Sequence, residues 1–253
     1  MFHLLERWLV YPAPPLGPAD WHPADLPYED VTFTGDDGTR LHGWYVAHAA
    51  PRATVLYCHG NGEHVAHLTD WLRVLHELIG VTVLAWDYRG YGRSEGVPHE
   101  ENLIADARAA QLSLADRAGV PPKEVVLMGR SLGGSVAVAV AAQYPIRALV
   151  LDRTYARLTD TAARFFPWLP VRWFMRNRFP SLERIANYHG PLLQTHGSDD
   201  EIVPIEMGRQ LFDAAASRQK QFITVPGGTH NEPLPEFCYQ ALIEFIDELK
   251  PDD

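Results

Sequence analysis

A serine between two glycines, placed between an apolar run and a segment of alanine and valine, constrains the fold more than any other stretch. The apolar run is 125–128, Gly-Arg-Ser-Leu-Gly occupies 129–133, and the small apolar residues fill 136–142. This order predicts a buried strand that turns sharply into a helix with Ser131 at the turn, where glycines two residues away leave the room that Cβ atoms would take. The helix would begin beneath Ser131 and point its positive end at a developing oxyanion. We interpret the stretch as a nucleophile elbow rather than as a glycine-rich turn with an incidental serine.

The length and composition suit a single α/β domain spanning 1–253. Apolar residues make up 46% of the 253 residues, which is enough for a sizeable core. The net charge of −10 argues against a nucleic-acid partner, because such a partner requires a basic patch. The two cysteines, Cys58 and Cys238, stand in apolar strand and helix patterns, which is typical of reduced core thiols. They favour a reducing, cytoplasmic compartment.

Residues 1–12 are apolar at both ends but carry Glu6 and Arg7 between them. They lack the basic start, the unbroken apolar run and the small-residue cleavage site of a secretory signal, and they are too short to span a bilayer. We expect a short amphipathic helix that packs on the domain. Contact with a membrane surface is the alternative.

The hydrophobic pattern further along the chain predicts a mostly parallel sheet of eight strands with helices on both faces. Residues 31–34 and 41–46 alternate at period two around a Gly-Asp-Asp-Gly turn, so we expect an antiparallel hairpin to open the sheet. After it, apolar strand patterns alternate with helical ones, which is typical of parallel strands joined by crossover helices. The strands are expected at 53–58, 81–86, 124–128, 147–151, 191–195 and 220–225, and the helices at 62–78, 100–118, 132–143, 204–217 and 234–249.

One segment interrupts this alternation. Residues 153–190 are too many for a single crossover helix, and they contain the aromatic, proline-interrupted stretches 165–170 and 171–175. We expect a small helical cap, inserted into the single domain, that roofs a pocket. An ordinary helical excursion packed on the domain is the alternative.

Polar residues gather in the loops that follow the predicted strands. In a parallel sheet, these loops meet at one edge and form the ligand crevice. They read His-Gly-Asn-Gly-Glu at 59–63, Asp-Tyr-Arg-Gly-Tyr-Gly-Arg-Ser at 87–94, the serine turn at 129–133, His-Gly-Ser-Asp-Asp-Glu-Ile-Val-Pro at 196–204 and Pro-Gly-Gly-Thr-His-Asn at 226–231. We therefore expect the unusual residues of the chain to lie side by side.

These motifs, with their order of serine elbow, strand-end acid and late histidine, resemble the α/β-hydrolase fold over nearly the whole chain from about residue 28. The loops at 59–62, 87–94 and 196–204, the stretch 5–14 and the proline-aromatic segment are similar to the Bem46-like group of serine hydrolases. The resemblance implies a serine hydrolase. It identifies no substrate.

Ser131 is a poor nucleophile unless a base lies within hydrogen-bond reach. Of the 12 histidines, His59 and His196 lie in strand-end turns ahead of a glycine, where a histidine more often braces the loop. His230 follows the last strand across a flexible glycine pair, so its loop can lean over the sheet edge, and it matches the histidine position of the family. We expect His230 to be the base rather than an exposed loop histidine.

The acid that orients this histidine has three candidates. The resemblance favours Asp200, which has the spacing of the family between Gly197 and Val203. Asp199 is its neighbour and Asp152 ends the preceding strand, so both remain alternatives.

In this fold, two backbone N–H groups hold the oxyanion, one from the residue after the nucleophile and one from the first strand-to-helix loop. Here they are those of Leu132 and Asn61. His59, His64 and His67 are spaced loosely enough to suggest a metal, but the resemblance places them at the oxyanion loop and on the following helix. We therefore expect no metal and no cofactor.

The residues together predict a carboxylesterase-like serine hydrolase with Ser131, Asp200 and His230 as a catalytic triad. It would cleave carboxylic esters of small or medium apolar acyl groups through an acyl-enzyme intermediate, as a monomer or homodimer acting on a small-molecule ester or thioester. The alternatives are a thioesterase acting on acyl-protein or acyl-CoA, a peptidase, and a non-catalytic binding scaffold. Arg153, directly after a predicted strand, is expected either at the pocket entrance, where it would attract anionic substrates, or in a surface ion pair.

Overall fold

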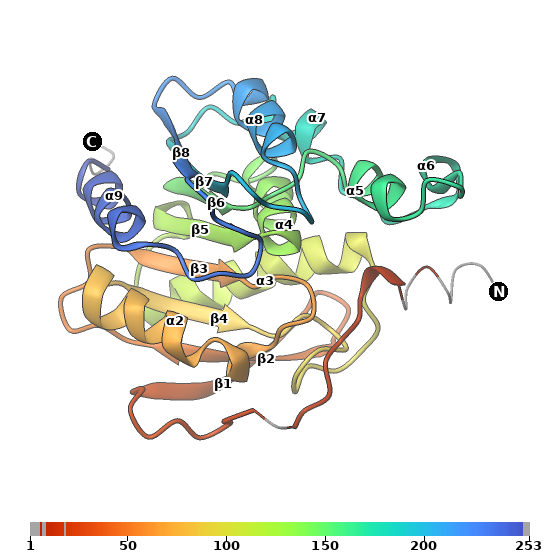
Figure 1. Ribbon diagram of the computed structural model, residues 1–253. Helices are drawn as coiled ribbons and strands as arrows, with labels where there is room; N and C mark the ends of the chain where they lie inside the picture. Colours follow the sequence, from red (N-terminus) through yellow and green to blue (C-terminus); the bar gives the residue numbers. More distant parts are fainter. Residues whose placement is uncertain (1–5, 7–8, 18, 250–253) are drawn as a thin grey trace.

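A sheet of eight strands runs through the middle of the molecule (Figure 1). The strands are Tyr28–Thr34 (β1), Arg40–Val46 (β2), Thr54–Cys58 (β3), Thr82–Trp86 (β4), Val125–Arg130 (β5), Ala148–Asp152 (β6), Leu192–Gly197 (β7) and Lys220–Val225 (β8). The computed structural model describes residues 6, 9–17 and 19–249. The strand order is β1-β2-β4-β3-β5-β6-β7-β8, in which β2 pairs antiparallel with β1 and β4 while all other neighbours pair parallel. The predicted mostly parallel sheet, opened by an antiparallel hairpin, is confirmed.

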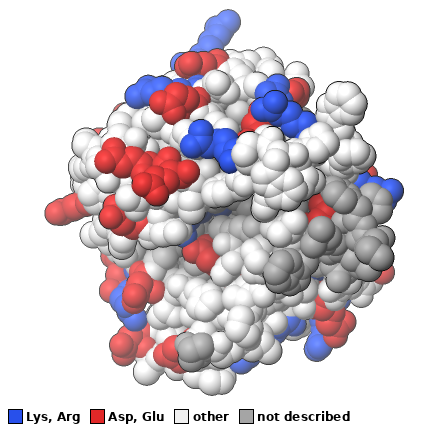
Figure 2. Space-filling view, turned by 45° about the vertical axis from the view of Figure 1, so that its right-hand side comes forward, with Lys and Arg blue, Asp and Glu red and all other residues white. Residues whose placement is uncertain are grey.

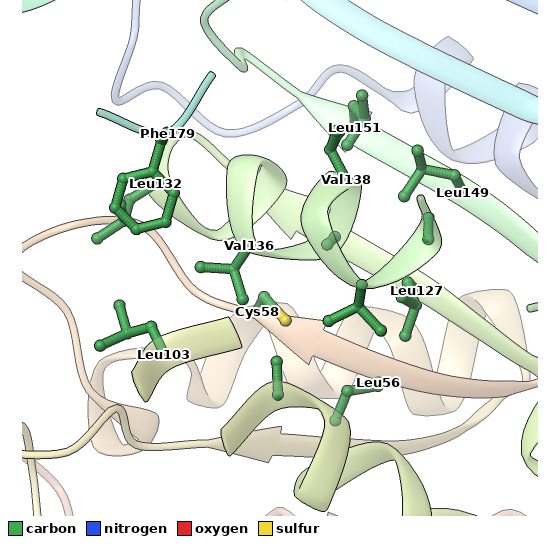
Figure 3. Close-up of a cluster of buried hydrophobic side chains, with 14 of the residues drawn as sticks. Leu56, Cys58, Leu103, Leu127, Leu132, Val136, Val138, Leu149, Leu151 and Phe179 are labelled. Carbon is green, nitrogen blue, oxygen red and sulfur yellow. The ribbon is translucent and has the colours of Figure 1, made fainter. Parts of the chain in front are cut away.

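The central strands are apolar on both sides because helices cover both faces of the sheet. Every residue of β3 and β4 is buried. On one face, Val136 and Val138 of the helix after β5 pack in a cluster with Leu56 and Leu127 (Figure 3). A second buried cluster fills the other face. The first face carries α3 (Glu100–Ala118), α4 (Leu132–Ala141) and α8 (Ile205–Ala214), and the second carries α2 (Thr69–Arg73), η2 (Val74–Ile79) and α9 (Glu236–Asp247).

The first crossover differs from the expected single helix over 62–78. The chain instead forms a 3₁₀ turn (η1, Val65–His67), then α2, then the π-helical η2. The N–H of Val65 donates to Oδ1 of Asp87 (2.9 Å), a carboxylate in the loop after β4. The apolar spacing predicts the buried face only in part, because Leu78 is 52% exposed and its neighbour Ile79 is buried. The regular helix begins later because this carboxylate takes an N–H at its start.

The chain between β6 and β7 forms three short helices, α5 (Leu158–Phe165), α6 (Val171–Phe174) and α7 (Ser181–Ile185). The first two project beyond the carboxyl ends of the strands (Figure 1). Oε2 of Glu100, a buried residue at the start of α3, accepts the backbone N–H groups of Arg178 (2.6 Å) and Phe179 (2.9 Å). These bonds fasten the segment to the body of the domain.

The expected N-terminal helix lies mostly outside the described residues, which do not include 1–5, 7 and 8. Oε1 of Glu6 accepts the backbone N–H groups of Arg176 (2.7 Å) and Asn177 (2.9 Å). Glu6 therefore lies against the segment between α6 and α7. Among the described residues, no helix combines the length and the hydrophobicity that crossing a bilayer requires.

A buried histidine between two carboxylates makes the stability of the fold depend on pH. Nδ1 of His42 lies 2.7 Å from Oδ2 of Asp87, and Nε2 lies 2.7 Å from Oδ1 of Asp30. Burial alone would lower the pKa of His42, but the hydrogen bonds to Asp87 and Asp30 outweigh burial and raise this pKa. Both ring nitrogens donate only in the imidazolium. The stabilisation is therefore complete below the unfolded-state pKa of about 6.5 and is lost as the pH rises through the higher folded-state pKa.

We expect the free energy of unfolding of the wild type to exceed that of His42→Gln most at about pH 5.5, and this difference to shrink above about pH 7. Urea unfolding across this range measures it. Asp30→Asn removes the negative charge beside Nε2 of His42 but keeps an oxygen acceptor, so it should weaken the pH dependence. A difference that does not change with pH would contradict the assignment.

Candidate active site

The register of the sheet brings the loops after the strands to one edge. Cys58 of β3 lies opposite Gly129 of β5, and Asp152 of β6 lies opposite Thr195 of β7. Ser131 follows β5 at this edge, and its backbone N–H donates to the carbonyl of Asp152 (2.9 Å). The strand-end loops are therefore neighbours in space, as the sequence pattern predicts.

Ser131 stands at the sharp turn between β5 and α4. Its φ of 52° and ψ of −114° are a strained conformation for a residue with a side chain. A Cβ on Gly129 would lie 2.3 Å from the carbonyl oxygen of Gly133, and a Cβ on Gly133 would lie 2.0 Å from the carbonyl oxygen of Cys58. The two glycines therefore permit a close approach of backbone to backbone. This agrees with the prediction that Cβ atoms would not fit at these two positions.

Gly133→Ala is expected to lower the free energy of unfolding by about 3 kcal/mol or more, because backbone rather than a flexible side chain would have to move. Gly17→Ala is the control, since nothing lies within 4 Å of a Cβ placed there. Urea denaturation compares the two variants with the wild type. An unchanged midpoint for Gly133→Ala would contradict the close approach.

The structure brings Ser131, His230 and Asp200 into one hydrogen-bonded line. Nε2 of His230 lies 3.2 Å from Oγ of Ser131, and Nδ1 lies 2.7 Å from Oδ2 of Asp200. All three residues are buried. Because an ionised carboxylate can only accept, Nδ1 carries the proton and Nε2 is left to accept from the Ser131 hydroxyl. This is the arrangement that a general base for a serine requires.

The surroundings of Asp200 keep its carboxylate ionised. Burial alone would raise the pKa of Asp200, but hydrogen bonds from His230 and from the N–H of Val203 outweigh burial and lower it. Oδ1 accepts the backbone N–H groups of Ile202 (3.0 Å) and Val203 (2.7 Å), which leaves Oδ2 for His230. His196 lies 3.5 Å from Oδ2, but its Nε2 donates to the carbonyl of Val203 (2.7 Å) and burial lowers its pKa. His196 therefore adds no positive charge beside this carboxylate at neutral pH.

The two other candidate acids lie apart from the histidine. Asp199 is exposed and accepts the hydroxyl of the serine that precedes it (2.7 Å). Asp152 accepts the hydroxyl of Thr195 (2.8 Å) and Nη1 of Arg153 (3.0 Å). Among the three carboxylates that the sequence leaves open, Asp200 alone is hydrogen-bonded to the ring.

The two expected oxyanion donors lie on the same pocket as Ser131. Leu132 is the first residue of α4, so its N–H has no acceptor within the helix. The side chain of Asn61 is engaged at both ends, since Nδ2 donates to the carbonyl of Val10 (2.6 Å) and Oδ1 accepts the hydroxyl of Tyr91 (2.7 Å). These bonds fix the loop through the side chain of Asn61 and do not involve its backbone N–H.

Arg130, the variable residue of the elbow, connects the loops around Ser131. Its Nη1 donates to Oε1 of Glu63 (2.6 Å), and its Nη2 donates to the carbonyl of His230 (2.7 Å) and to Oδ1 of Asn231 (3.0 Å). Oε2 of Glu63 accepts the N–H of Gly60 (2.7 Å) in the loop after β3. Arg130 thus connects the loop of His230 to the loop after β3. The elbow motif leaves this position open, so the sequence carried no signal for this role.

A pocket of about 430 Å³ opens at these residues, a size typical of small-molecule sites. The segment 153–190 contributes Leu158 and Phe165 to its wall, and the loop after β7 contributes Ile202 and Val203. Figure 2 looks toward the side to which the strands point and shows a hollow near the middle of this face, with charged side chains above it and mostly uncharged surface below it.

The three histidines that suggested a metal make different contacts. The rings of His64 and His67 stack at 3.8 Å, and Nδ1 of His59 bonds the carbonyl of Gly60 (2.7 Å). Within the part of the chain that the structure describes, no group of three or more His, Cys, Asp or Glu side chains is arranged to hold a metal ion. His59 braces the loop after β3 through this contact, as its place in a strand-end turn predicts.

The sheet order and the serine at the elbow define an α/β hydrolase. A family model described as serine aminopeptidase, S33, matches residues 49–183, and the chain belongs to this family.

Known proteins similar to this chain support the same class. "Uncharacterized protein Rv2307c" of Mycobacterium tuberculosis is 41% identical over 231 residues, which are 90% of this chain and 81% of that protein. "Alpha/beta hydrolase domain-containing protein WAV2" of Arabidopsis thaliana is 30% identical over 253 residues, with the same coverage of 90% and 81%. The solved structure of the Pyrococcus furiosus esterase Pf2001 aligns with a TM-score of 0.77 at 25% identity and covers 94% of this chain and 99% of that one. None of these matches names the Bem46-like group, so that finer assignment stays a prediction.

Proposed function

We propose that this protein is a serine hydrolase that cleaves carboxylic esters of small or medium apolar acyl groups. The observation that carries the proposal is the line from Ser131 Oγ through the His230 ring to Asp200, with separations of 3.2 Å and 2.7 Å. The likeness to a solved esterase at 25% identity supports the ester as the bond that is cleaved.

In the first half of the reaction, Ser131 attacks the carbonyl carbon while Nε2 of His230 takes the hydroxyl proton. The negative charge that forms on the carbonyl oxygen is held by the N–H groups of Asn61 and Leu132. One such donor typically contributes about 3–4 kcal/mol to the stability of the transition state. His230 then returns the proton to the departing alkoxide, and the alcohol leaves an acyl group on Ser131.

In the second half, water attacks the acyl carbon and His230 takes a proton from it. The oxyanion forms at the same two N–H groups. When it collapses, the proton passes back to Oγ of Ser131 and the carboxylic acid is released. Asp200 stays ionised throughout and stabilises the imidazolium that forms in both halves.

Within this proposal, the segment 153–190 is a cap inserted into a single α/β-hydrolase domain. Leu158 and Phe165 give the pocket an apolar wall that suits an acyl chain. Phe165 is about half exposed, at 55%, so the wall that it forms lies toward the mouth of the pocket.

The family description makes an aminopeptidase the second candidate. Such an enzyme must hold the free ammonium group of its substrate, which calls for an unpaired carboxylate at the pocket. Glu63 is the acidic side chain that lines the described pocket, and its oxygens already accept from Arg130 (2.6 Å) and from the N–H of Gly60 (2.7 Å). The charge distribution therefore favours esters that carry no amino group.

Two measurements test the proposal. A fluorophosphonate probe, followed by peptide mapping, should label Ser131.

Rates on p-nitrophenyl esters of increasing acyl length should fall sharply beyond a medium chain, and leucine p-nitroanilide should be cleaved more slowly than the best ester. Faster cleavage of the anilide would favour the peptidase, faster cleavage of acyl-CoA would favour the thioesterase, and absence of label on Ser131 would contradict the serine mechanism.

A further inference from the structure

A second cavity, here called the rear cavity, lies on the opposite face of the sheet from α4. Its volume is about 300 Å³, and residues of α2, η2 and α9 cover it. Most of its wall is apolar, and its members include Tyr57, Met128, Val150 and Leu193 from the strands with Trp71 and Leu242 from the helices. The buried cluster on this face is separate from the one around α4.

One charged side chain enters the rear cavity from the edge of the sheet. Arg153 follows β6, is only 2% exposed, and lines the rear cavity rather than the pocket at Ser131. The expectation that it stands at the pocket entrance or in a surface ion pair is therefore wrong. Its φ of 47° is strained for a residue with a side chain, and its N–H donates to the carbonyl of Thr195 (3.0 Å). With this backbone conformation, the side chain of Arg153 lies in the wall of the rear cavity.

The guanidinium of Arg153 is only partly engaged. Nη1 donates to Oδ2 of Asp152 (3.0 Å). Nε and Nη2 are buried and have no hydrogen-bond partner among the described residues. These two nitrogens form one edge of the guanidinium, from which parallel N–H bonds point in the same direction. Leaving a buried donor unpaired is unfavourable, and more so for a charged group.

The other charged groups around the rear cavity are paired or lie at its mouth. Arg130 pairs with Glu63 (2.6 Å). Asp70 and Glu232 are exposed. Within the described residues, Arg153 has its one ion pair with the aspartate that precedes it, so no second carboxylate accepts from Nε or Nη2.

We infer that the rear cavity binds a small monocarboxylate with an apolar tail, whose two oxygens accept the Nε and Nη2 hydrogens of Arg153. The planar fork of a guanidinium matches the spacing of carboxylate oxygens, which makes two parallel, charge-assisted bonds. The apolar wall takes the tail, whose removal from water is favourable. A volume of about 300 Å³ is at the lower end for ligand pockets and suits a medium-chain or aryl acid. The inference does not depend on the proposed function, because Ser131, Asp200 and His230 do not line this cavity.

The methyl groups of two methionines report which side of the sheet is occupied. Met128 lines the rear cavity, whereas the sulfur of Met207 contacts the hydroxyl of Thr161 (3.6 Å), a residue of the pocket at Ser131. The full-length protein with isotope-labelled methionine methyl groups is titrated with octanoate, octanol and octylammonium and followed by NMR. Octanoate should shift the Met128 signal to saturation. Octanol and octylammonium should need at least about tenfold higher concentrations, a difference of about 1.4 kcal/mol.

Substitutions of Arg153 test the head-group contact. Arg153→Gln should weaken octanoate binding at Met128 by about tenfold or more, and Arg153→Lys should also weaken it because an ammonium lacks the fork. Arg209→Gln, which alters an exposed arginine of α8, should leave the binding unchanged.

Three results would overturn the inference: a shift at Met207 without one at Met128, equal binding of octanol and octanoate, or wild-type affinity in Arg153→Gln. Circular dichroism shows whether Arg153→Gln is folded. Where that variant does not fold, the comparison of the acid with the alcohol on the wild type decides alone.

Discussion

Ser131→Ala should lower kcat for p-nitrophenyl butyrate by about 10⁴-fold or more. Oγ of Ser131 lies 3.2 Å from Nε2 of His230, and alanine leaves no atom that can give up a proton and attack the carbonyl carbon. The pocket and the N–H groups of Asn61 and Leu132 would remain. They can still bind the ester and stabilise an oxyanion formed by water, so a small residual rate above the uncatalysed one is expected.

Ser135→Ala is the matched control for this measurement. Ser135 lies one helical turn further along α4 and is completely buried, so both variants remove one buried hydroxyl from the same element. Ser135→Ala should keep the wild-type kcat. Urea unfolding establishes that both variants are folded at the assay temperature. Retained activity in Ser131→Ala, or an equal loss in Ser135→Ala, would contradict the assignment of the nucleophile.

The elbow could be predicted from the sequence because its determinants are local. The sharp turn, the strained φ of Ser131 and the absence of Cβ atoms at Gly129 and Gly133 all follow from residues within a few positions of one another. The strands could be predicted for the same reason, since β3 and β4 are continuous apolar runs that are buried on both faces.

Contacts between distant loops could not be predicted in this way. Asp152 ends β6 while Asp199 and Asp200 follow β7 at the same edge, and the choice among them depends on where His230 comes to lie. The 62–78 helix begins later than expected because the carboxylate that takes the Val65 N–H stands more than 20 positions away in the chain. Only the assembled sheet decides such pairings.

Arg153 and Arg130 show a different limit. Arg153 lies in the wall of the rear cavity with a φ of 47°, a conformation that the neighbouring residues do not predict. Arg130 occupies the open position of the elbow motif, and its role depends on Glu63 and on the carbonyl of His230. The role of a charged residue at an open motif position cannot be predicted until the positions of its hydrogen-bond partners are known.

Asp200→Asn should lower kcat by about 10⁴-fold with little change in fold, an effect of the size seen when the triad acid becomes an amide. The amide oxygen is expected to stay at the N–H groups of Ile202 (3.0 Å) and Val203 (2.7 Å), because these two donors need an acceptor. The amide nitrogen would then face Nδ1 of His230 and donate to it. The proton of the ring would move to Nε2, which could no longer accept from Ser131.

Asp199→Asn and Asp152→Asn are the controls that separate the three candidate acids. Asp199 is exposed, and Asp152 holds Thr195 and Arg153 instead of the histidine, so both variants should keep kcat within about tenfold of the wild type. The measurement is kcat for p-nitrophenyl butyrate in each variant, with urea midpoints to separate loss of activity from loss of fold. A large loss in Asp152→Asn together with an active Asp200→Asn would move the acid to the end of β6. Ser131 and His230 would keep their proposed roles in that case, because their 3.2 Å contact does not involve either aspartate.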